Sequence, residues 1–218
     1  MTNITEELII NAYAQGVFPM ADNALSDDIY WVDPQMRGII PLETFHLPRK
    51  LAKKIRQGVF DIRIDTSFIQ VIEGCAASLN QKGRKETWIN GEIISLYAKL
   101  FDKGFVHTVE CWQKGEMVGG LYGVSLGGAF CGESMFHKVT DASKVALAYL
   151  VARLKAGNYC LLDTQFITPH LAQFGTIEIP RHEYKSRLHK ALGITGNFYS
   201  LDEDVGPETT LQVLTHTS

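Results

Sequence analysis

Two stretches carry the strongest signals in this chain: Gly119-Gly-Leu-Tyr-Gly-Val-Ser-Leu-Gly-Gly-Ala-Phe-Cys-Gly-Glu-Ser-Met-Phe136 and Leu161-Leu-Asp-Thr-Gln165. They predict two short strands joined by a glycine-bearing turn and, after a helix, a third strand. Glu133 falls at the expected end of one strand and Asp163 at the expected end of another. Acidic residues are depleted in strands. Two of them at strand ends, on either side of one helix, therefore indicate a shared anionic site.

Hydrophobic periodicity and capping residues predict the remaining elements outward from these stretches. Helices are expected over 5–15, 47–57, 66–77, 90–103, 140–157 and 182–192, with a short one from Thr168. Strands are expected near 30–32 and 38–40, and over 59–65, 105–112, 116–125, 128–132, 159–163 and 176–179. Thr5 and Thr140 are expected to cap the helices that follow them.

The order of these elements from residue 58 resembles that of the acetyltransferase (GNAT) fold. We therefore expect an α+β protein, with a GNAT-like mixed sheet flanked by helices and a small irregular N-terminal subdomain. In that fold the fourth and fifth strands run parallel and splay apart; here they would be 128–132 and 159–163. Ligands of open α/β sheets bind at the carboxyl ends of parallel strands, which places Glu133 and Asp163 near one cleft.

Composition along the chain suggests three parts. Residues 1–57 hold four of the seven prolines and a basic helix, so we expect a small N-terminal subdomain there. Residues 58–200 show regular periodicities and form the expected catalytic domain. Residues 201–218 are expected to be a polar tail.

The net charge of −3 excludes a general polyanion binder, so any nucleic-acid surface must be local. The stretch Arg49-Lys-Leu-Ala-Lys-Lys-Ile-Arg56 carries five positive charges and no negative one. A solvated helix face is its ordinary explanation, and a track for nucleic-acid phosphates is the alternative.

The four cysteines are widely spaced and lack the pattern of a zinc site, so we expect no metal and buried, reduced thiols. The histidines are scattered, without the spacing of a metal site or a catalytic triad. No apolar run approaches the ~20 residues that span a bilayer, and no hydrophobic leader is seen. These features favour a cytoplasmic protein that does not enter a membrane.

Three polar side chains near the expected cleft have two interpretations each. Asp163 and Gln165 point to the same side of an extended segment, where they could hold an ammonium group and accept its protons. Alternatively, Asp163 ends a strand and bonds nearby backbone amides. Glu133 lies either in an exposed turn or among apolar neighbours, where a carboxylate needs a partner or a shifted pKa.

Other residues near the cleft are equally open to two interpretations. Apolar and aromatic side chains there are usually core, although they could line a side-chain pocket; they are Trp88, Tyr97, Leu121, Phe130 and Leu162. The backbone amides at Asp141–Lys144, which open the long helix, could bind a phosphate or a ribose. Thr140 and Asp141 are, however, also ordinary helix caps.

Several long motifs, in order, carry a resemblance to a known family. They include Ala14-Gln-Gly-Val-Phe-Pro19, Thr87-Trp-Ile89, His107-Thr-Val-Glu110, Phe130-Cys-Gly-Glu-Ser-Met-Phe136, Ala142-Ser-Lys144, Asp163-Thr-Gln165 and Ile179-Pro-Arg181. Over about residues 8–200 the chain resembles the leucyl/phenylalanyl-tRNA–protein transferases. The resemblance implies transfer of Leu or Phe from aminoacyl-tRNA to proteins with N-terminal Arg or Lys, which marks them for degradation. It implies no cofactor.

The resemblance also implies a role for each matching residue. Asp163 and Gln165 match the catalytic pair, in which the carboxylate is proposed to polarise the amide, and Glu133 matches a residue that holds the cationic acceptor. The implied aminoacyl pocket consists of Trp31, Trp88, Tyr97, Leu121, Phe130 and Leu162. Candidates for binding tRNA phosphates are Arg49, Lys50, Lys53, Lys54 and Lys144. We expect Asp163→Ala to abolish transfer and leave the fold intact.

The sequence departs from the family pattern at Tyr30-Trp-Val-Asp33, where a Trp-Trp-Ser-Pro run is expected. Two other functions stay open. One is an acetyl-CoA N-acetyltransferase of the same fold, although the glycine-bearing pyrophosphate signature of that fold is missing. The other is a non-catalytic reader of basic N-termini or of tRNA.

Overall fold

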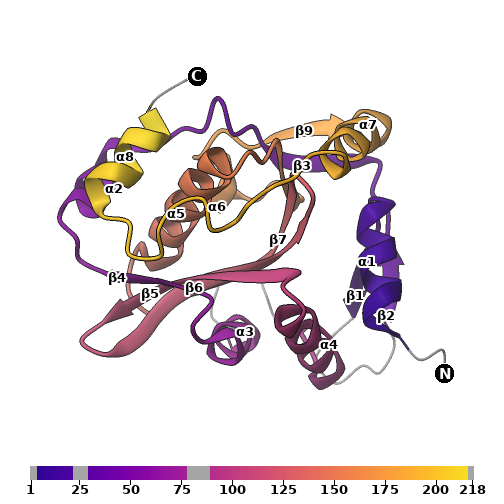
Figure 1. Ribbon diagram of the computed structural model, residues 1–218, viewed down its shortest axis with the longest axis horizontal. Helices are drawn as coiled ribbons and strands as arrows, with labels where there is room; N and C mark the ends of the chain where they lie inside the picture. The colour runs from indigo at the N-terminus through magenta and orange to yellow at the C-terminus, as the bar shows by residue number, and fades with distance from the viewer. Residues whose placement is uncertain (1–3, 22–28, 78–88, 216–218) are drawn as a thin grey trace.

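The computed structural model describes residues 4–21, 29–77 and 89–215 and contains both helices and strands (Figure 1). The helices are α1 (Glu6–Ala14), α2 (Arg49–Arg56), α3 (Phe68–Ala77), α4 (Gly91–Asp102), α5 (Ala142–Ala156), α6 (Pro169–Ala172), α7 (Arg181–Leu192) and α8 (Pro207–Thr215). The strands are β1 (Phe18–Ala21), β2 (Ile29–Val32), β3 (Met36–Ile40), β4 (Asp61–Ile64), β5 (Val106–Gln113), β6 (Glu116–Leu126), β7 (Ala129–His137), β8 (Leu161–Gln165) and β9 (Ile177–Pro180).

The main sheet has seven strands in the order β4-β5-β6-β7-β8-β3-β9. Its β7–β8 pair is parallel and its other pairs are antiparallel, while β1 and β2 form a separate two-stranded sheet. Helices α3 and α4 cover one face of β5–β7, and α5, with α2 and α8 beyond it, covers the other (Figure 1). The prediction of a mixed α+β sheet flanked by helices is confirmed.

The hydrophobic core is divided by this sheet into two main clusters. One lies on the α5 side, where every residue of α5 from Ala142 to Leu154 except Lys144 is buried, including the polar Ser143 and the charged Arg153. The other lies beneath α3 and α4 and includes the hydroxyl-bearing side chains of Tyr13 and Tyr97. Both clusters reach β7, which therefore carries side chains into either layer.

The predicted parallel pair positions the site. Pairing between β7 and β8 starts at Ala129 opposite Leu161 and ends at Cys131 opposite Asp163. The pairing stops there, so Glu133 on β7 and Gln165 on β8 lie beyond the last paired residues of the two strands. The expected splaying of these two strands is thus seen in their register.

Several element boundaries differ from the sequence-based expectations. β7 continues to His137, so Glu133 lies inside a strand rather than at its end. Thr5 caps α1 as predicted, but Thr140 does not cap α5: its N-cap is Asp141, whose φ of 73° is left-handed and whose side chain makes no capping hydrogen bond. β1 was not expected, because Pro19 interrupts its strand pattern.

The expected division of the chain differs from the observed packing at two places. β3 and α2, assigned to the subdomain 1–57, lie within the seven-stranded sheet and against α5 and α8. The region 201–218 is not simply a polar tail, because α8 buries Leu211 and Leu214 against the core. The apolar residues of α8 that pack on the core are Leu211, Val213 and Leu214, a pattern too short to stand out in a polar segment.

Candidate active site

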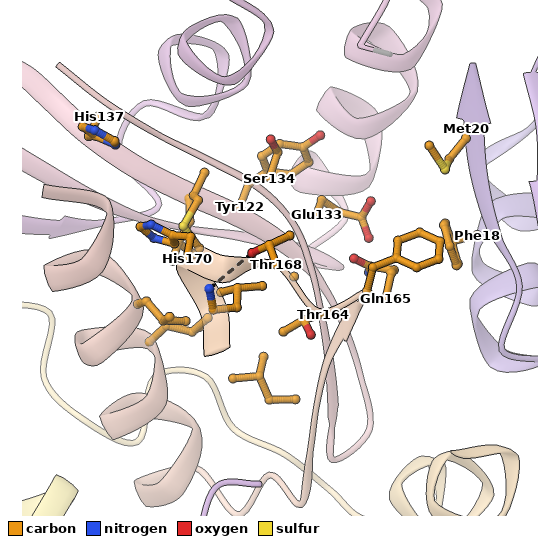
Figure 2. A pocket seen from close by; sticks show the side chains of 18 of the residues that line it. Phe18, Met20, Tyr122, Glu133, Ser134, His137, Thr164, Gln165, Thr168 and His170 are labelled. Atoms are coloured by element: carbon orange, nitrogen blue, oxygen red, sulfur yellow. Dashed lines mark hydrogen bonds between the residues drawn. The ribbon is translucent and has the colours of Figure 1, made fainter. Parts of the chain in front are cut away.

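A cavity of about 770 Å³ opens where β7 and β8 separate (Figure 2). That volume is within the range of small-molecule sites in proteins. Its walls come from β1, β6, β7, α5 and the segment from β8 through α6. The lining residues are Phe18, Pro19, Met20, Leu121, Tyr122, Gly132, Glu133, Ser134, Met135, His137, Leu147, Leu150, Leu162, Thr164, Gln165, Phe166, Thr168, Pro169, His170 and Leu171.

Glu133 enters this cavity because of a β-bulge. The pairing of β6 with β7 steps from Tyr122–Ser134 to Gly123–Gly132, so Glu133 is the extra residue of β7. Bulges redirect a side chain out of the regular alternation. Oε2 of Glu133 accepts a long hydrogen bond of 3.5 Å from the Tyr97 hydroxyl, and Oε1 is enclosed without a hydrogen-bond partner among the described residues.

Burial raises the pKa of Glu133 to about 8. Hydrogen bonding to Tyr13 opposes the shift, and the negative charge of Asp163 adds to it. The hydroxyls of Tyr13 and Tyr97 lie 2.5 Å apart, which joins α1 and α4 behind the carboxyl group. A cation that entered the pocket would favour the charged form of Glu133, because opposite charges at short range lower a carboxyl pKa.

Asp163 is fully buried and both of its carboxylate oxygens are bound. The Arg37 guanidinium donates to Oδ1 from Nε at 2.8 Å and to Oδ2 from Nη2 at 2.6 Å, a bidentate ion pair. The Tyr184 hydroxyl donates to Oδ2 at 2.9 Å. Burial lowers the pKa of Arg37, but the charge of Asp163 and the hydrogen bonds to it together outweigh burial, so the net shift is upward and the guanidinium stays charged.

Gln165 ends β8 with a φ of 57°, in the left-handed region. Its backbone N–H donates to Asp163 Oδ1 at 2.9 Å, while its side-chain Nε2 is enclosed and has no partner among the described residues. Asp163 therefore bonds the backbone of Gln165, as the strand-end alternative anticipates. No hydrogen bond of the described residues joins Asp163 to the side-chain amide.

The structure brings only part of the expected aminoacyl pocket together. Leu121 and Leu162 line the cavity, whereas the buried Phe130 instead stacks on Phe198 with ring centroids 5.7 Å apart. Trp31 is 37% exposed on β2 and does not line it. Tyr97 bonds Glu133 from behind the cavity, and Trp88 lies outside the described residues. Sequence reasoning missed further apolar lining residues, among them Met135, Leu147, Leu150 and Leu171.

The cavity has a second polar end, formed by His137 and His170 (Figure 2). His137 Nδ1 lies 3.2 Å from the Ser143 hydroxyl, and His170 Nε2 is enclosed without a partner among the described residues. Burial, helped by the charge of Lys144, lowers the pKa of His170. No local sequence spacing could reveal this pair, because its members come from two separate elements.

The basic helix α2 lies beside the start of α5. Lys54 bonds Asp141 at 2.7 Å, and Lys144 pairs with the same carboxylate at 3.2 Å. Hydrogen bonding to Lys54 lowers the pKa of Asp141. Three exposed cations of α2 form no ion pair within the described part of the chain: Arg49, Lys50 and Lys53. They are the most available charges of the expected tRNA-binding set.

In residues 4–21, 29–77 and 89–215, no cluster of three or more His, Cys, Asp or Glu side chains could hold a metal ion. In the same ranges no helix has the length and apolarity needed to cross a bilayer.

A large pocket at the carboxyl ends of parallel strands, with a buried carboxyl group of raised pKa, is typical of the active site of an enzyme. Comparison with known proteins narrows this class. The model of the leucyl/phenylalanyl-tRNA protein transferase family matches residues 39–189, and the model of its N-terminal domain matches residues 2–35. The chain belongs to the leucyl/phenylalanyl-tRNA protein transferase family, as the sequence motifs predicted.

Individual relatives agree with this assignment. A leucyl/phenylalanyl-tRNA–protein transferase of Caulobacter vibrioides is 56% identical over 197 residues, 90% of each chain. The enzyme of the same name from Maricaulis maris is 51% identical over 218 residues, 100% of each chain. The solved structure of L-PGS from Bacillus licheniformis is 14% identical, with a TM-score of 0.41 over 72% of this chain and 51% of that one. That likeness is too weak to indicate a function.

Proposed function

We propose that this enzyme transfers Leu or Phe from aminoacyl-tRNA to the α-amine of proteins whose N-terminal residue is Arg or Lys, and that the product is marked for degradation. The observation that carries the proposal is the pocket itself. An enclosed, unpaired carboxyl oxygen of Glu133 and an enclosed, unpaired amide of Gln165 face the same cavity within the described chain. Charged tRNA is a cytoplasmic substrate, so we place the enzyme in the cytoplasm.

The acceptor is assigned to the end of the cavity that contains Glu133. A buried carboxylate needs a positive partner, and the side chain of an N-terminal Arg or Lys supplies one. With that side chain held by Glu133, the neighbouring α-amine lies within the same end of the pocket as Gln165. A basic N-terminal residue is then preferred because its positive charge stabilises the ionised form of Glu133, whereas a neutral side chain gives the carboxyl group no such partner.

The aminoacyl group is assigned to the apolar middle of the cavity. Leu121 and Leu162 come from the sheet, and Leu147 and Leu150 come from α5. Such a surface accepts Leu and Phe side chains. Because apolar pockets distinguish one methylene by only ~1–3 kcal/mol, Met should also be accepted.

The reaction is the aminolysis of an ester. The amine nitrogen attacks the ester carbonyl, a C–N bond forms, the C–O bond to the ribose breaks, the amine loses a proton and the ribose oxygen gains one. An α-amine has a pKa near ~8, so part of it is neutral at pH 7, and the ester is already activated. The main task of the protein is positioning.

We assign the contact with the amine to Gln165, whose amide oxygen can accept a hydrogen bond from it. Asp163 is assigned an orienting role, because Arg37 and Tyr184 already occupy its two oxygens.

The tRNA is assigned to the surface beside the start of α5. Arg49, Lys50 and Lys53 supply exposed charge for phosphates, while Lys54 and Lys144 are partly neutralised by Asp141. This surface adjoins the histidine end of the cavity, since the charges of Lys144 and Asp141 both act on His170.

The test is incubation with Leu-tRNA and a peptide that begins with Arg, followed by mass spectrometry. A gain of one leucyl residue at the peptide N-terminus is expected, and a matched peptide that begins with Ala should stay unmodified. Binding of the Arg peptide without any mass gain would instead identify a non-catalytic reader. A gain of one acetyl group, in the presence of acetyl-CoA, would identify an acetyltransferase.

A further inference from the structure

The backbone of Gln165 is in an unusual state for the residue that we assign to the amine. Its φ of 57° lies in the left-handed region, which is unfavourable for a residue that has a side chain. Such strain persists only where surrounding structure holds it in place. The contacts of this turn identify the residues that hold it.

One hold on the turn is electrostatic and comes from Arg37. The backbone N–H of Gln165 donates to Asp163 Oδ1, and that same oxygen accepts the hydrogen bond from Arg37 Nε. Arg37 is itself fixed: Nη1 donates to the Gly16 carbonyl at 3.0 Å, and the rings of Phe18 and Tyr184 lie 4.5 and 4.4 Å from the guanidinium carbon.

The other hold is steric and comes from the next residue, Gly38. Gly38 pairs with Gln165 across β3 and β8, and the register shifts between Gly38 and Ile39. A Cβ placed on Gly38 would lie 2.7 Å from the backbone carbonyl carbon of Phe166, closer than a real Cβ contact. Only glycine therefore lets the chain after Gln165 approach β3 so closely.

Neither of these two residues lines the cavity, and Arg37 is 1% exposed, so neither contacts a substrate there. We propose that the Arg37-Gly38 pair of β3 is a positioning element, which fixes the turn at Gln165 so that its side-chain amide faces the pocket. The inference rests on the proposed function, in which Gln165 contacts the attacking amine. Tyr184, which bonds both Arg37 and Asp163, supports the pair.

The test compares Arg37→Lys and Gly38→Ala with the wild-type enzyme. Lysine keeps the charge but lacks the fork that binds two oxygens, and alanine displaces the backbone of Phe166. Each variant should lower kcat about 10- to 100-fold through misplacement of the amide, while KM for Leu-tRNA stays unchanged. Gly206→Ala is the matched control, because its added Cβ would meet no atom within 4 Å; it should keep full activity.

A double-variant cycle separates positioning from a merely structural role. Gln165→Gly keeps the left-handed turn and deletes the amide, so in that background Arg37→Lys and Gly38→Ala should cause no further loss of kcat. Losses that multiply in the double variants would overturn the inference. If Arg37→Lys and Gly38→Ala fail to fold, Tyr184→Phe can replace them in the cycle with Gln165→Gly. It removes one hydroxyl and leaves the ion pair between Arg37 and Asp163 in place. Its loss should likewise vanish in the Gln165→Gly background.

The two proposals fail in different ways. Wild-type enzyme that transfers neither Leu nor Phe would overturn the proposed function and this inference with it. Wild-type enzyme that transfers normally, with variants whose KM rises while kcat is unchanged, would overturn only the inference.

Discussion

At the scale of single residues, the charge of Glu133 depends on what occupies the pocket. Its carboxyl pKa of about 8 means that the empty site holds a proton at neutral pH. In the proposed function, the guanidinium or ammonium group of the acceptor displaces this proton. Acceptor recognition is thereby coupled to proton release, which gives a measurable pH dependence.

Affinity for a peptide that begins with Arg should rise as the pH increases towards about 8, because less work is needed to ionise Glu133. In Glu133→Gln the affinity should be lower and the rise should be absent. Isothermal titration calorimetry from about pH 6 to about pH 9 measures both. The peptide α-amine titrates in the same range for both proteins, so their difference isolates Glu133. Parallel pH profiles would contradict the assignment.

The same carboxyl group should affect folding stability. Between the ordinary glutamate pKa and about 8, the native state holds a proton that the unfolded state has released. Stability therefore falls as the pH rises through this window. Glu133→Gln should flatten the fall and unfold at higher urea concentration than wild-type near pH 8. An unchanged pH slope in the variant would show that Glu133 is not the group responsible.

Asp163 contributes to the stability of the fold, which its sequence context does not reveal. We expected Asp163→Ala to leave the fold intact, but removal of this carboxylate strands the buried charge of Arg37. Breaking a buried pair costs ~3–5 kcal/mol, which urea denaturation should detect. Asp163→Ala combined with Arg37→Met should recover part of the loss, because no charge is then buried alone. Full stability of the single variant would refute this account.

At the scale of secondary-structure elements, α2 presents cations of two kinds. Lys53 is exposed and unpaired within the described residues, whereas Lys54 is held by Asp141. If α2 binds tRNA phosphates, Lys53→Glu should raise KM for Leu-tRNA. It should also reduce the slope of log K for tRNA binding against log salt concentration by about one. Filter binding at several salt concentrations measures the slope.

The control for this prediction lies on a distant helix. Lys190 is exposed on α7, which occupies the opposite end of the molecule from α2 (Figure 1). Lys190→Glu changes the net charge by the same amount as Lys53→Glu. It should leave the salt slope unchanged; equal effects would mean that tRNA responds to overall charge rather than to α2.

Elements were predictable from sequence where a local pattern determines them. The parallel pair and α5 follow from apolar periodicity and from the glycine-bearing turns. The full length of β7 does not, because Gly132-Glu-Ser134 interrupts the strand pattern and only pairing with β6 extends it. The bulge at Glu133 is likewise a property of two strands together, and no single segment encodes it visibly.

The sequence motifs pointed to residues near the cavity, but they did not reveal which other residues those side chains contact. Motifs pointed to Asp163, Gln165 and Glu133, and all three lie at the cavity or directly behind it. The partner of Asp163 was not foreseen, because Arg37 is 126 positions away and has no local mark of burial. Phe130 stacks on Phe198 and does not line the cavity. An apolar residue on a strand does not reveal in the sequence whether it faces a cavity or packs beneath it.

At the scale of the whole molecule, the sheet joins parts that composition separated. β3 lies between β8 and β9, so a chain that starts at residue 58 would leave two strands without their shared neighbour and Asp163 without Arg37. Such a chain should not unfold cooperatively. Circular dichroism during heating compares it with the full protein, and a sharp transition near the wild-type Tm would show that 58–200 is an independent domain.

The position of β3 also has a consequence for biosynthesis. Arg37 leaves the ribosome long before Asp163, and at ~5–20 residues per second the intervening 126 residues take about 6–25 s to make. Throughout that interval β3 has neither of its partner strands, β8 and β9. The active site is thus completed near the end of translation, and a truncated nascent chain cannot be catalytically competent.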